Sequence, residues 1–215
     1  MSDDLRKLLL QVVDRLEKTY PDAHLELNYS NPFELLIATI LAAQCTDAKV
    51  NQVTETLFKK YPDPAAFLAV DLAQLQEDIR ALTFYRNKAK YIRACCELLV
   101  EKHGGKVPDR VEDLVKCPGV GRKTANIVLA NAMGIPAIGV DTHTIRVPNR
   151  LGVVASKDPD EIERVLCDLL PRERWNRANI LIQWHGRYTC TAKQPRCGEC
   201  TVFDLCRWPD KESFS

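Results

Sequence analysis

Apolar residues recur three and four positions apart along most of the 215-residue chain, and the two-residue alternation of strands hardly occurs. This spacing places apolar side chains on one face of a helix, and the segments end at Gly, Pro or Asn clusters. Two start signals, NPFE at 31–34 and DPDE at 158–161, each combine an N-cap, a first-turn proline and a capping-box Glu. The chain is therefore predicted to be all-α.

Helices are expected at about 47–60, 72–81, 87–102, 110–117 and 123–133, then from near Thr142, and finally over 174–190. The length allows two modest lobes, and 46% hydrophobic with 27% charged residues is a globular composition. Membrane spans need about 18 uninterrupted apolar residues, and secretory signals need a small-residue cleavage site. Neither is present, so no membrane segment and no export are expected.

PGVG, residues 118–121, lies between two predicted helices and predicts a helix-hairpin-helix unit. Glycine tolerates the positive φ of a tight turn, and free N–H groups there and at the helix start favour an anion. Arg122 and Lys123 follow in the first turn, where the helix dipole disfavours positive charge. Either an anion faces them or one of them loses its proton. A plain turn between packed helices is the alternative, but the cations favour phosphate binding.

Lys123 would act as a nucleophile only without its proton, because a lysine with the ordinary pKa of about 10.4 is protonated at neutral pH. The helix N-terminus, the neighbouring Arg122 and partial burial would all disfavour its ammonium form. Asp141, in VDTHTIR, can accept a proton or stabilise developing positive charge. It is equally a natural N-cap before Thr142. The two roles are compatible.

Nine cysteines without a secretory signal indicate reduced thiols or metal ligands rather than disulfides. Four of them crowd into the tail, with six, two and five residues between them: Cys190, Cys197, Cys200 and Cys206. Four thiolates suit either zinc or an iron–sulfur cluster. The single C-x-x-C pair slightly favours a cluster. The other cysteines are interpreted as core thiols: Cys45, Cys95, Cys96, Cys117 and Cys167.

The formal net charge of +1 does not by itself indicate a nucleic-acid binder. The charge is uneven, however. Residues 84–93 hold four cations and no acid, and residues 172–207 hold seven cations against three acids. A solvated helix face is the ordinary alternative for such runs.

PGVGRKTAN followed by VDTHTIRVPNRLG resembles the helix-hairpin-helix and Gly/Pro-rich loop of the endonuclease III family of DNA glycosylases, over nearly the whole chain. The cysteine tail is similar to the [4Fe–4S] loop of that family. The resemblance implies a helical domain at 25–135 and a cluster domain made of 1–24 and 136–215, with DNA in the cleft between them. It also implies that Lys123 is the catalytic amine and Asp141 its acidic partner.

Further roles follow from the same resemblance. A glycosylase takes its base out of the duplex, so a side chain must fill the hole. Gln44 and Phe84 are the expected plug and wedge, Asp47 and His143 the pocket lining, and the remaining DNA contacts are Gly119, Val120, Gly121, Arg122, His143, Lys193 and Arg196. Asp47 is alternatively a first-turn acid, and His143 a satisfied helix histidine.

The chain also departs from the family pattern at several positions. Cys117 stands where Leu is usual, Pro148 falls in a helix, Thr83 occupies the usual glycine position before the wedge, and Gln194 replaces a frequent cation. Packing is the expected reason for the first two. Thr83 leaves the wedge residue open, and Gln194 predicts a weaker contribution of the loop to DNA binding.

The expected function is a bifunctional DNA glycosylase and AP lyase that excises oxidised pyrimidines and nicks the strand by β-elimination in base excision repair. The implied cofactor is a [4Fe–4S] cluster, and the implied partner is double-stranded DNA with a damaged base or abasic site. No membrane contact, a monomeric state and a cytoplasmic, nucleoid-associated location are also expected. One alternative is an adenine or other monofunctional glycosylase, although the adenine enzymes lack a lysine at the Lys123 position. Another is a non-catalytic DNA-binding module with a zinc-stapled tail.

Overall fold

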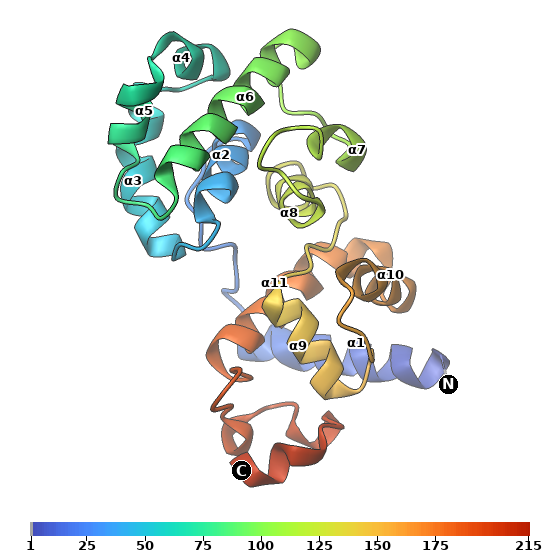
Figure 1. Ribbon diagram of the computed structural model, residues 1–215. Coiled ribbons are helices and arrows are strands. Elements are labelled where there is room, and N and C mark those ends of the chain that lie inside the picture. Colours follow the sequence, from blue (N-terminus) through green and yellow to red (C-terminus); the bar gives the residue numbers. More distant parts are fainter. Residues whose placement is uncertain (1) are drawn as a thin grey trace. The chain divides into compact units, whose positions relative to one another are not determined.

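The computed structural model describes residues 2–215, which form two compact units. One comprises the described residues up to His24 together with Pro136–Ser215, and the other is Leu25–Ile135. Every regular element described is a helix (Figure 1). The all-α prediction is confirmed. None of the described helices is both long and apolar enough to cross a membrane.

The Leu25–Ile135 unit is built around one apolar helix. Its elements are α2 (Pro32–Ala42), α3 (Asp47–Lys60), α4 (Pro64–Ala69), α5 (Leu72–Asp78), α6 (Tyr85–His103), α7 (Val111–Leu114) and α8 (Arg122–Ala132). Nearly all of α2 is buried, as expected for a helix that is hydrophobic on all sides. Helices α3, α6 and α8 pack around it, and α4 and α5 pack on α6 (Figure 1).

Capping at α2 differs from the prediction in one detail. Asn31 caps the helix as expected, because its side-chain oxygen accepts the Glu34 amide at 2.9 Å. The Glu34 carboxylate then accepts the amide of Ser30, one residue earlier than a capping box requires. The chain entering the helix is thereby fixed at two successive residues.

A polar contact joins α3 to α5. The Asp78 side chain, only 10% exposed, accepts hydrogen bonds from Lys60 Nζ and Tyr61 Oη, both at 2.7 Å, and from Gln74 Nε2 at 3.1 Å. Burial alone would raise the pKa of Asp78, but these donors lower it below the usual range. Burial and the neighbouring carboxylate raise the pKa of Tyr61 to about 12.

The second unit joins the start of the chain to its end. Its helices are α1 (Ser2–Thr19), α9 (Thr142–Leu151), α10 (Pro159–Leu169), α11 (Trp175–Tyr188), and the 3-10 turns η1 (Arg172–Arg174), η2 (Cys197–Glu199), η3 (Phe203–Leu205) and η4 (Pro209–Phe214). Apolar faces of α1, α9, α10 and α11 share one core. Arg177 of α11 also forms a two-pronged contact with Glu17 and donates to the carbonyls of Tyr20 and Pro21. These bonds hold α1 and the loop after it on α11.

Candidate functional site

The hairpin between α7 and α8 is a tight turn fitted closely to α6. Gly119 has φ +83°, and a Cβ there would lie 3.0 Å from Tyr91 Cβ. Both the backbone conformation and the space therefore require glycine. The Val120 side chain is buried, and its amide donates to Cys117 O at 3.0 Å within the turn. The Val120 N–H is therefore bonded within the turn, and its buried side chain serves as an anchor; the DNA contact of Val120 remains a prediction.

Helix α8 begins directly after the hairpin. Gly121 is its N-cap residue, and the first helical hydrogen bond runs from the Ala125 amide to Gly121 O. The helix start thus presents backbone donors next to the exposed side chains of Arg122 and Lys123, with no acid in the first turn. The partial burial expected for Lys123 is not observed, because the second residue of α8 faces outward at its exposed end.

Asp141 is the N-cap of α9, as its alternative role required. Its Oδ1 accepts the amides of His143 at 2.9 Å and Thr144 at 2.8 Å. Both bonds end on the same oxygen, so Oδ2 is not used by the cap. Capping and carboxylate chemistry are therefore compatible in one half-buried side chain.

His143 is fixed by two neighbours in its own unit. Its Nδ1 lies 3.1 Å from Arg146 Nη2, and because a guanidinium only donates, Nδ1 is the acceptor in this contact. Gly186 of α11 provides the space for the ring, since a Cβ there would lie 2.7 Å from His143 Cβ. Arg146 also donates to the carbonyls of Gly186 and Cys190.

Three of the predicted DNA-contacting residues line one hollow in the Leu25–Ile135 unit. Gln44, Phe84 and Gly119 share this opening of about 250 Å³ with Lys88 and Tyr91. Gln44 and Phe84 have φ of 56° and 54°, and no other non-glycine residue among those described has positive φ. Such conformations are uncommon for bulky side chains and must be held by surrounding contacts. Phe84 is 60% exposed, as expected of a wedge.

The remaining predicted residues are not among those that line the hollow. Asp47 lies in the first turn of α3 and fits its alternative role as a first-turn acid. In the cysteine tail Lys193 is exposed, whereas Arg196 donates to Tyr188 O and pairs with Glu199.

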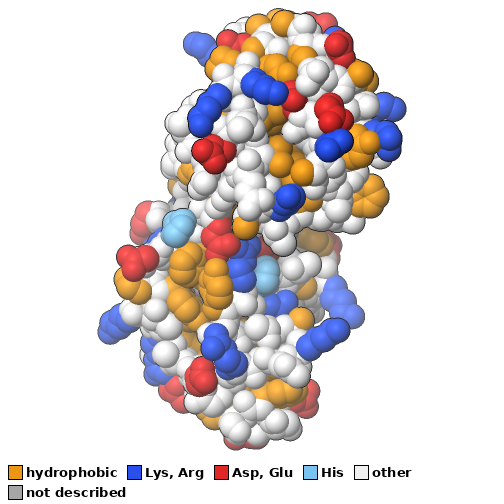
Figure 2. Space-filling view, turned by 90° about the vertical axis from the view of Figure 1, so that its left-hand side faces the viewer, with side chains coloured by type: hydrophobic (Ala, Val, Ile, Leu, Met, Phe, Trp, Pro, Cys, Tyr) orange, Lys and Arg blue, Asp and Glu red, His pale blue; other side chains and the backbone are white. Residues whose placement is uncertain are grey.

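On the face shown in Figure 2, Lys and Arg side chains lie among Asp and Glu side chains on both units. No large block of one charge stands out on that face, in keeping with the net charge of +1.

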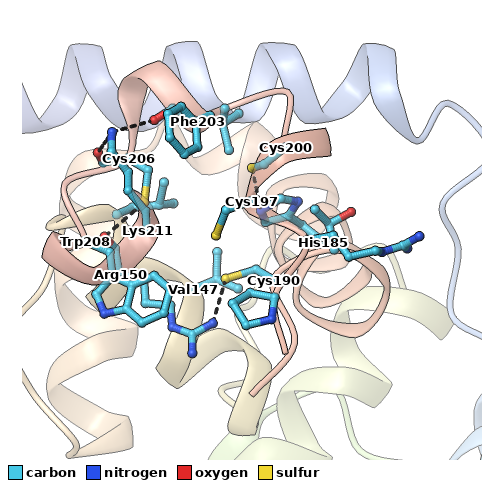
Figure 3. A pocket seen from close by; sticks show the side chains of 15 residues that line it. Val147, Arg150, His185, Cys190, Cys197, Cys200, Phe203, Cys206, Trp208 and Lys211 are labelled. Atoms are coloured by element: carbon cyan, nitrogen blue, oxygen red, sulfur yellow. Dashed lines mark hydrogen bonds between the residues drawn. The ribbon is translucent and has the colours of Figure 1, made fainter. Parts of the chain in front are cut away.

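The four tail cysteines surround one cavity. Cys190 follows α11, Cys197 begins η2, Cys200 follows η2 and Cys206 follows η3. All four line the cavity together with Arg150 and Lys211 (Figure 3). Within residues 2–215 no three His, Cys, Asp or Glu side chains converge as the ligands of a single ion would. The thiols are instead distributed around a shared space.

The chemistry of these thiols fits a group that carries positive charge between them. Burial raises the pKa of Cys200 to about 11, and burial and the neighbouring thiols also raise the pKa of Cys197 and Cys206. Thiolates at these three positions are therefore costly unless iron lies between them. Two cations lie where they stabilise negative charge on the thiols. Arg150 Nη1 donates to Cys190 Sγ at 3.3 Å, and Lys211 Nζ donates to Cys206 O at 2.8 Å.

Comparison with known proteins identifies both parts of the chain. A family model of the HhH-GPD superfamily of base excision DNA repair proteins matches residues 37–172. A model of the iron–sulfur binding domain of endonuclease III matches residues 190–206. The fold and these two matches define a helix-hairpin-helix base excision DNA repair protein with an iron–sulfur loop.

Comparison with individual relatives identifies the family within this class. Endonuclease III of Bacillus subtilis is 50% identical over 91% of this chain and 90% of the relative, and that of Escherichia coli K12 is 42% identical over 94% and 96%. A solved structure of an endonuclease III–DNA trapped covalent intermediate is 46% identical, with a TM-score of 0.92 over 97% of this chain and 98% of that one. The chain belongs to the endonuclease III family. It is a DNA glycosylase and AP lyase of base excision repair with a [4Fe–4S] cluster.

Several residues of the site were not predicted from the sequence. Lys88 and Tyr91 line the hollow, Arg146 holds His143, and Arg150 and Lys211 flank the cysteines. The first two lie in the acid-free basic run at 84–93, which was noted without assigning roles within it. Arg146 and Arg150 are one helical turn apart in α9, a spacing that puts both on one face.

Proposed function

We propose that the enzyme excises oxidised pyrimidines from duplex DNA with Lys123 as nucleophile and Asp141 as acid–base partner. Three observations support this. Lys123 is exposed at the start of α8, directly after a hairpin whose glycine amides can receive a phosphate. Asp141 has one carboxylate oxygen outside its helix cap. The solved structure of a trapped endonuclease III–DNA covalent intermediate shows that a similar protein forms a covalent bond with DNA. The observation that carries most weight is the exposed lysine at the hairpin.

The reaction follows from these groups. Deprotonated Lys123 Nζ attacks C1′ of the damaged nucleotide, so the N–C1′ bond forms while the bond to the base breaks, and the base leaves as an anion that takes a proton from water. Asp141 takes the proton lost by the amine and stabilises the positive charge that develops on the sugar. The opened sugar and Lys123 form a Schiff base. Removal of a 2′ proton then expels the 3′ phosphate and nicks the strand.

The cluster has a separate role. Cys190, Cys197, Cys200 and Cys206 hold it, and because all four ligands are protein thiolates, it supplies structural cross-linking of the tail rather than a substrate site. Lys193 on the tail, the hairpin amides, Arg122 and the side chains around the hollow then contact the duplex. We propose further that the protein acts as a monomer, since every proposed residue comes from one chain. A substrate of chromosomal DNA implies a cytoplasmic, nucleoid-associated location.

Borohydride trapping on a duplex with one oxidised pyrimidine tests this proposal. The wild-type protein should form a covalent complex, and Lys123→Gln should abolish trapping, base release and nicking while damaged DNA still binds. Lys116→Gln is the matched control, because Lys116 is an exposed lysine of the same hairpin region that pairs with Asp113. Full base release by Lys123→Gln with only nicking lost would assign base displacement to water and make Asp141 the principal catalyst.

A further inference from the structure

An unusual side-chain cluster adjoins the hollow. Cys45 follows Gln44 in the turn between α2 and α3 and is half-exposed. Lys88 Nζ of α6 donates to Cys45 Sγ at 3.2 Å, and Thr83 Oγ1 lies 3.1 Å from the same sulfur. Lys88 is only 3% exposed. Among the residues that the structure describes, Cys45 Sγ is the only hydrogen-bond acceptor of the Lys88 ammonium. A buried cation is normally paired with an anion, so its position favours a thiolate.

Cys45 is partly exposed, and its neighbours border an open hollow. Lys88 and Gln44 both line the open hollow, so a small molecule entering it approaches the ammonium beside Cys45. Cys95 and Cys96, in contrast, are fully buried. Partial exposure combined with a neighbouring cation is the setting in which cysteines react.

The electrostatics agree with this geometry. Burial by itself would raise the pKa of Cys45, but hydrogen bonds from Thr83 and Lys88 outweigh it and lower the pKa of this thiol below the ordinary cysteine value. Neither partner is an acid, so the cluster contains no competing anion. The thiolate, which is the nucleophilic form, is thereby favoured.

We propose that Cys45 is a reactive nucleophile and a site of covalent modification by small peroxides. Its sulfur attacks one peroxide oxygen, so that an S–O bond forms and the O–O bond breaks. The sulfur is oxidised by two electrons to a sulfenic acid, and the peroxide is reduced. The departing hydroxide takes a proton to become water.

Oxidation of Cys45 would disturb the two turns beside the sulfur. The consequence for nicking of DNA rests on the proposed function. Thr83 Oγ1 lies 2.8 Å from Gln44 O and 3.1 Å from Cys45 Sγ, so its single proton is shared between these two acceptors. One hydroxyl thereby ties the Gln44 turn to the turn bearing Phe84. Lys88 and Thr83 already lie at hydrogen-bond distance from the sulfur. We expect an oxygen added to the sulfur to compete for these two donors, which would loosen the tie between the proposed plug and the proposed wedge and slow nicking.

Limited alkylation of the holoenzyme without DNA tests the nucleophile. With substoichiometric iodoacetamide and peptide mass spectrometry, Cys45 should be modified about tenfold faster than Cys167, which is also half-exposed but lies in α10. Lys88→Met should remove most of this advantage, and Lys88→Arg should keep it. Should Lys88→Met fail to fold, Thr83→Val replaces it and should slow labelling. Equal rates at the two cysteines, or a folded Lys88→Met protein with an unchanged rate, would overturn the proposal.

Peroxide treatment tests the consequence. Wild-type enzyme exposed to hydrogen peroxide should form a dimedone adduct at Cys45 and lose most of its nicking rate, with recovery after dithiothreitol when dimedone is omitted. Cys45→Ser keeps an oxygen acceptor for Lys88 and should nick normally before and after treatment, while visible absorbance shows that the cluster is intact. Equal losses in both proteins would refute the effect on nicking. Failure of both proteins to nick before treatment would instead count against the proposed function, and the labelling ratio would still decide the reactivity of Cys45.

Discussion

Replacement of Asp141 separates helix capping from catalysis. Oδ1 accepts two amide hydrogen bonds, at 2.9 and 2.8 Å, so Asp141→Ala removes the whole cap of α9. Loss of an N-cap costs about 1 kcal/mol, and loss of a negative charge at a helix N-terminus about 0.5 kcal/mol more. At about 2 to 4 °C per kcal/mol for a chain of this size, the sum of about 1.5 kcal/mol lowers Tm by about 3 to 6 °C. Asp141→Asn and Asp141→Ser retain a capping oxygen and should remain within about 0.5 kcal/mol of wild type.

The nicking rates of the three Asp141 variants should follow a different order from their stabilities. None of the three variants has a carboxylate, so all should lose about two to four orders of magnitude in single-turnover nicking of a duplex with one oxidised pyrimidine. Thermal unfolding followed by circular dichroism gives the stability series on the same preparations. If Asn and Ser nick at the wild-type rate and only Ala is slow, Asp141 is a cap and not a catalytic group.

Three other predictions concern binding and stability. Gly119→Ala should cost about 1 to 3 kcal/mol in thermal unfolding and weaken binding to undamaged duplex, because its φ is +83° and its Cβ would press on a neighbouring tyrosine. Gly105→Ala, with φ +78° and open space around its Cβ, should be destabilised without a loss of binding; equal binding losses would contradict the hairpin contact. Lys193→Glu should reduce the slope of log affinity against log salt by about 1 or more, and Lys7→Glu in the same unit should not; equal slopes would mean that the tail does not contact DNA. Asp78 has a lowered pKa, so its stabilising contribution is complete above the unfolded pKa of about 4 and is lost as the pH falls through the folded value. Asp78→Asn should therefore lower the urea midpoint of unfolding at about pH 7. Between about pH 7 and about pH 3 the midpoint of this variant should decrease less than that of the wild type, and an equal decrease in both proteins would show that Asp78 does not cause it.

Prediction of the helices from sequence succeeded where the signals were local. Helix α3 was expected at 47–60 and occupies Asp47–Lys60, and Thr46 caps it by accepting the Lys49 amide. The six-residue α4 was not predicted, because one and a half turns give too short a window for periodicity. Helix α6 begins two residues earlier than expected. Its start is the left-handed Phe84, in a turn that Thr83 ties to the distant Gln44 turn, and no nearby sequence signal reveals that contact.

The chemistry of the site divides in a similar way. The [4Fe–4S] cofactor was predicted from the spacing and resemblance of the tail, and comparison with the family confirms it. The capping role of Asp141 was read from its position before Thr142, and the structure confirms it. The partial burial expected for Lys123 is not observed, and the Val120 amide is bonded within its turn, because exposure and hydrogen bonding there depend on how the hairpin packs on α6. The roles of Lys123 and Asp141 in the reaction remain predictions.

The sequence by itself determined most of the helices, several of their caps and the grouping of the tail cysteines, since these depend on residues that are close together in the chain. Only the tertiary structure decided that Cys45 meets Lys88, forty-three positions away, and that Gln44, Phe84 and Gly119 share one hollow. Those contacts arise because α2, α6 and α8 pack side by side, and packing brings together turns with no periodic relation in the chain. Local hydrogen bonding can be read from neighbouring residue types, whereas burial of an ammonium against a thiol is set by the whole folded unit.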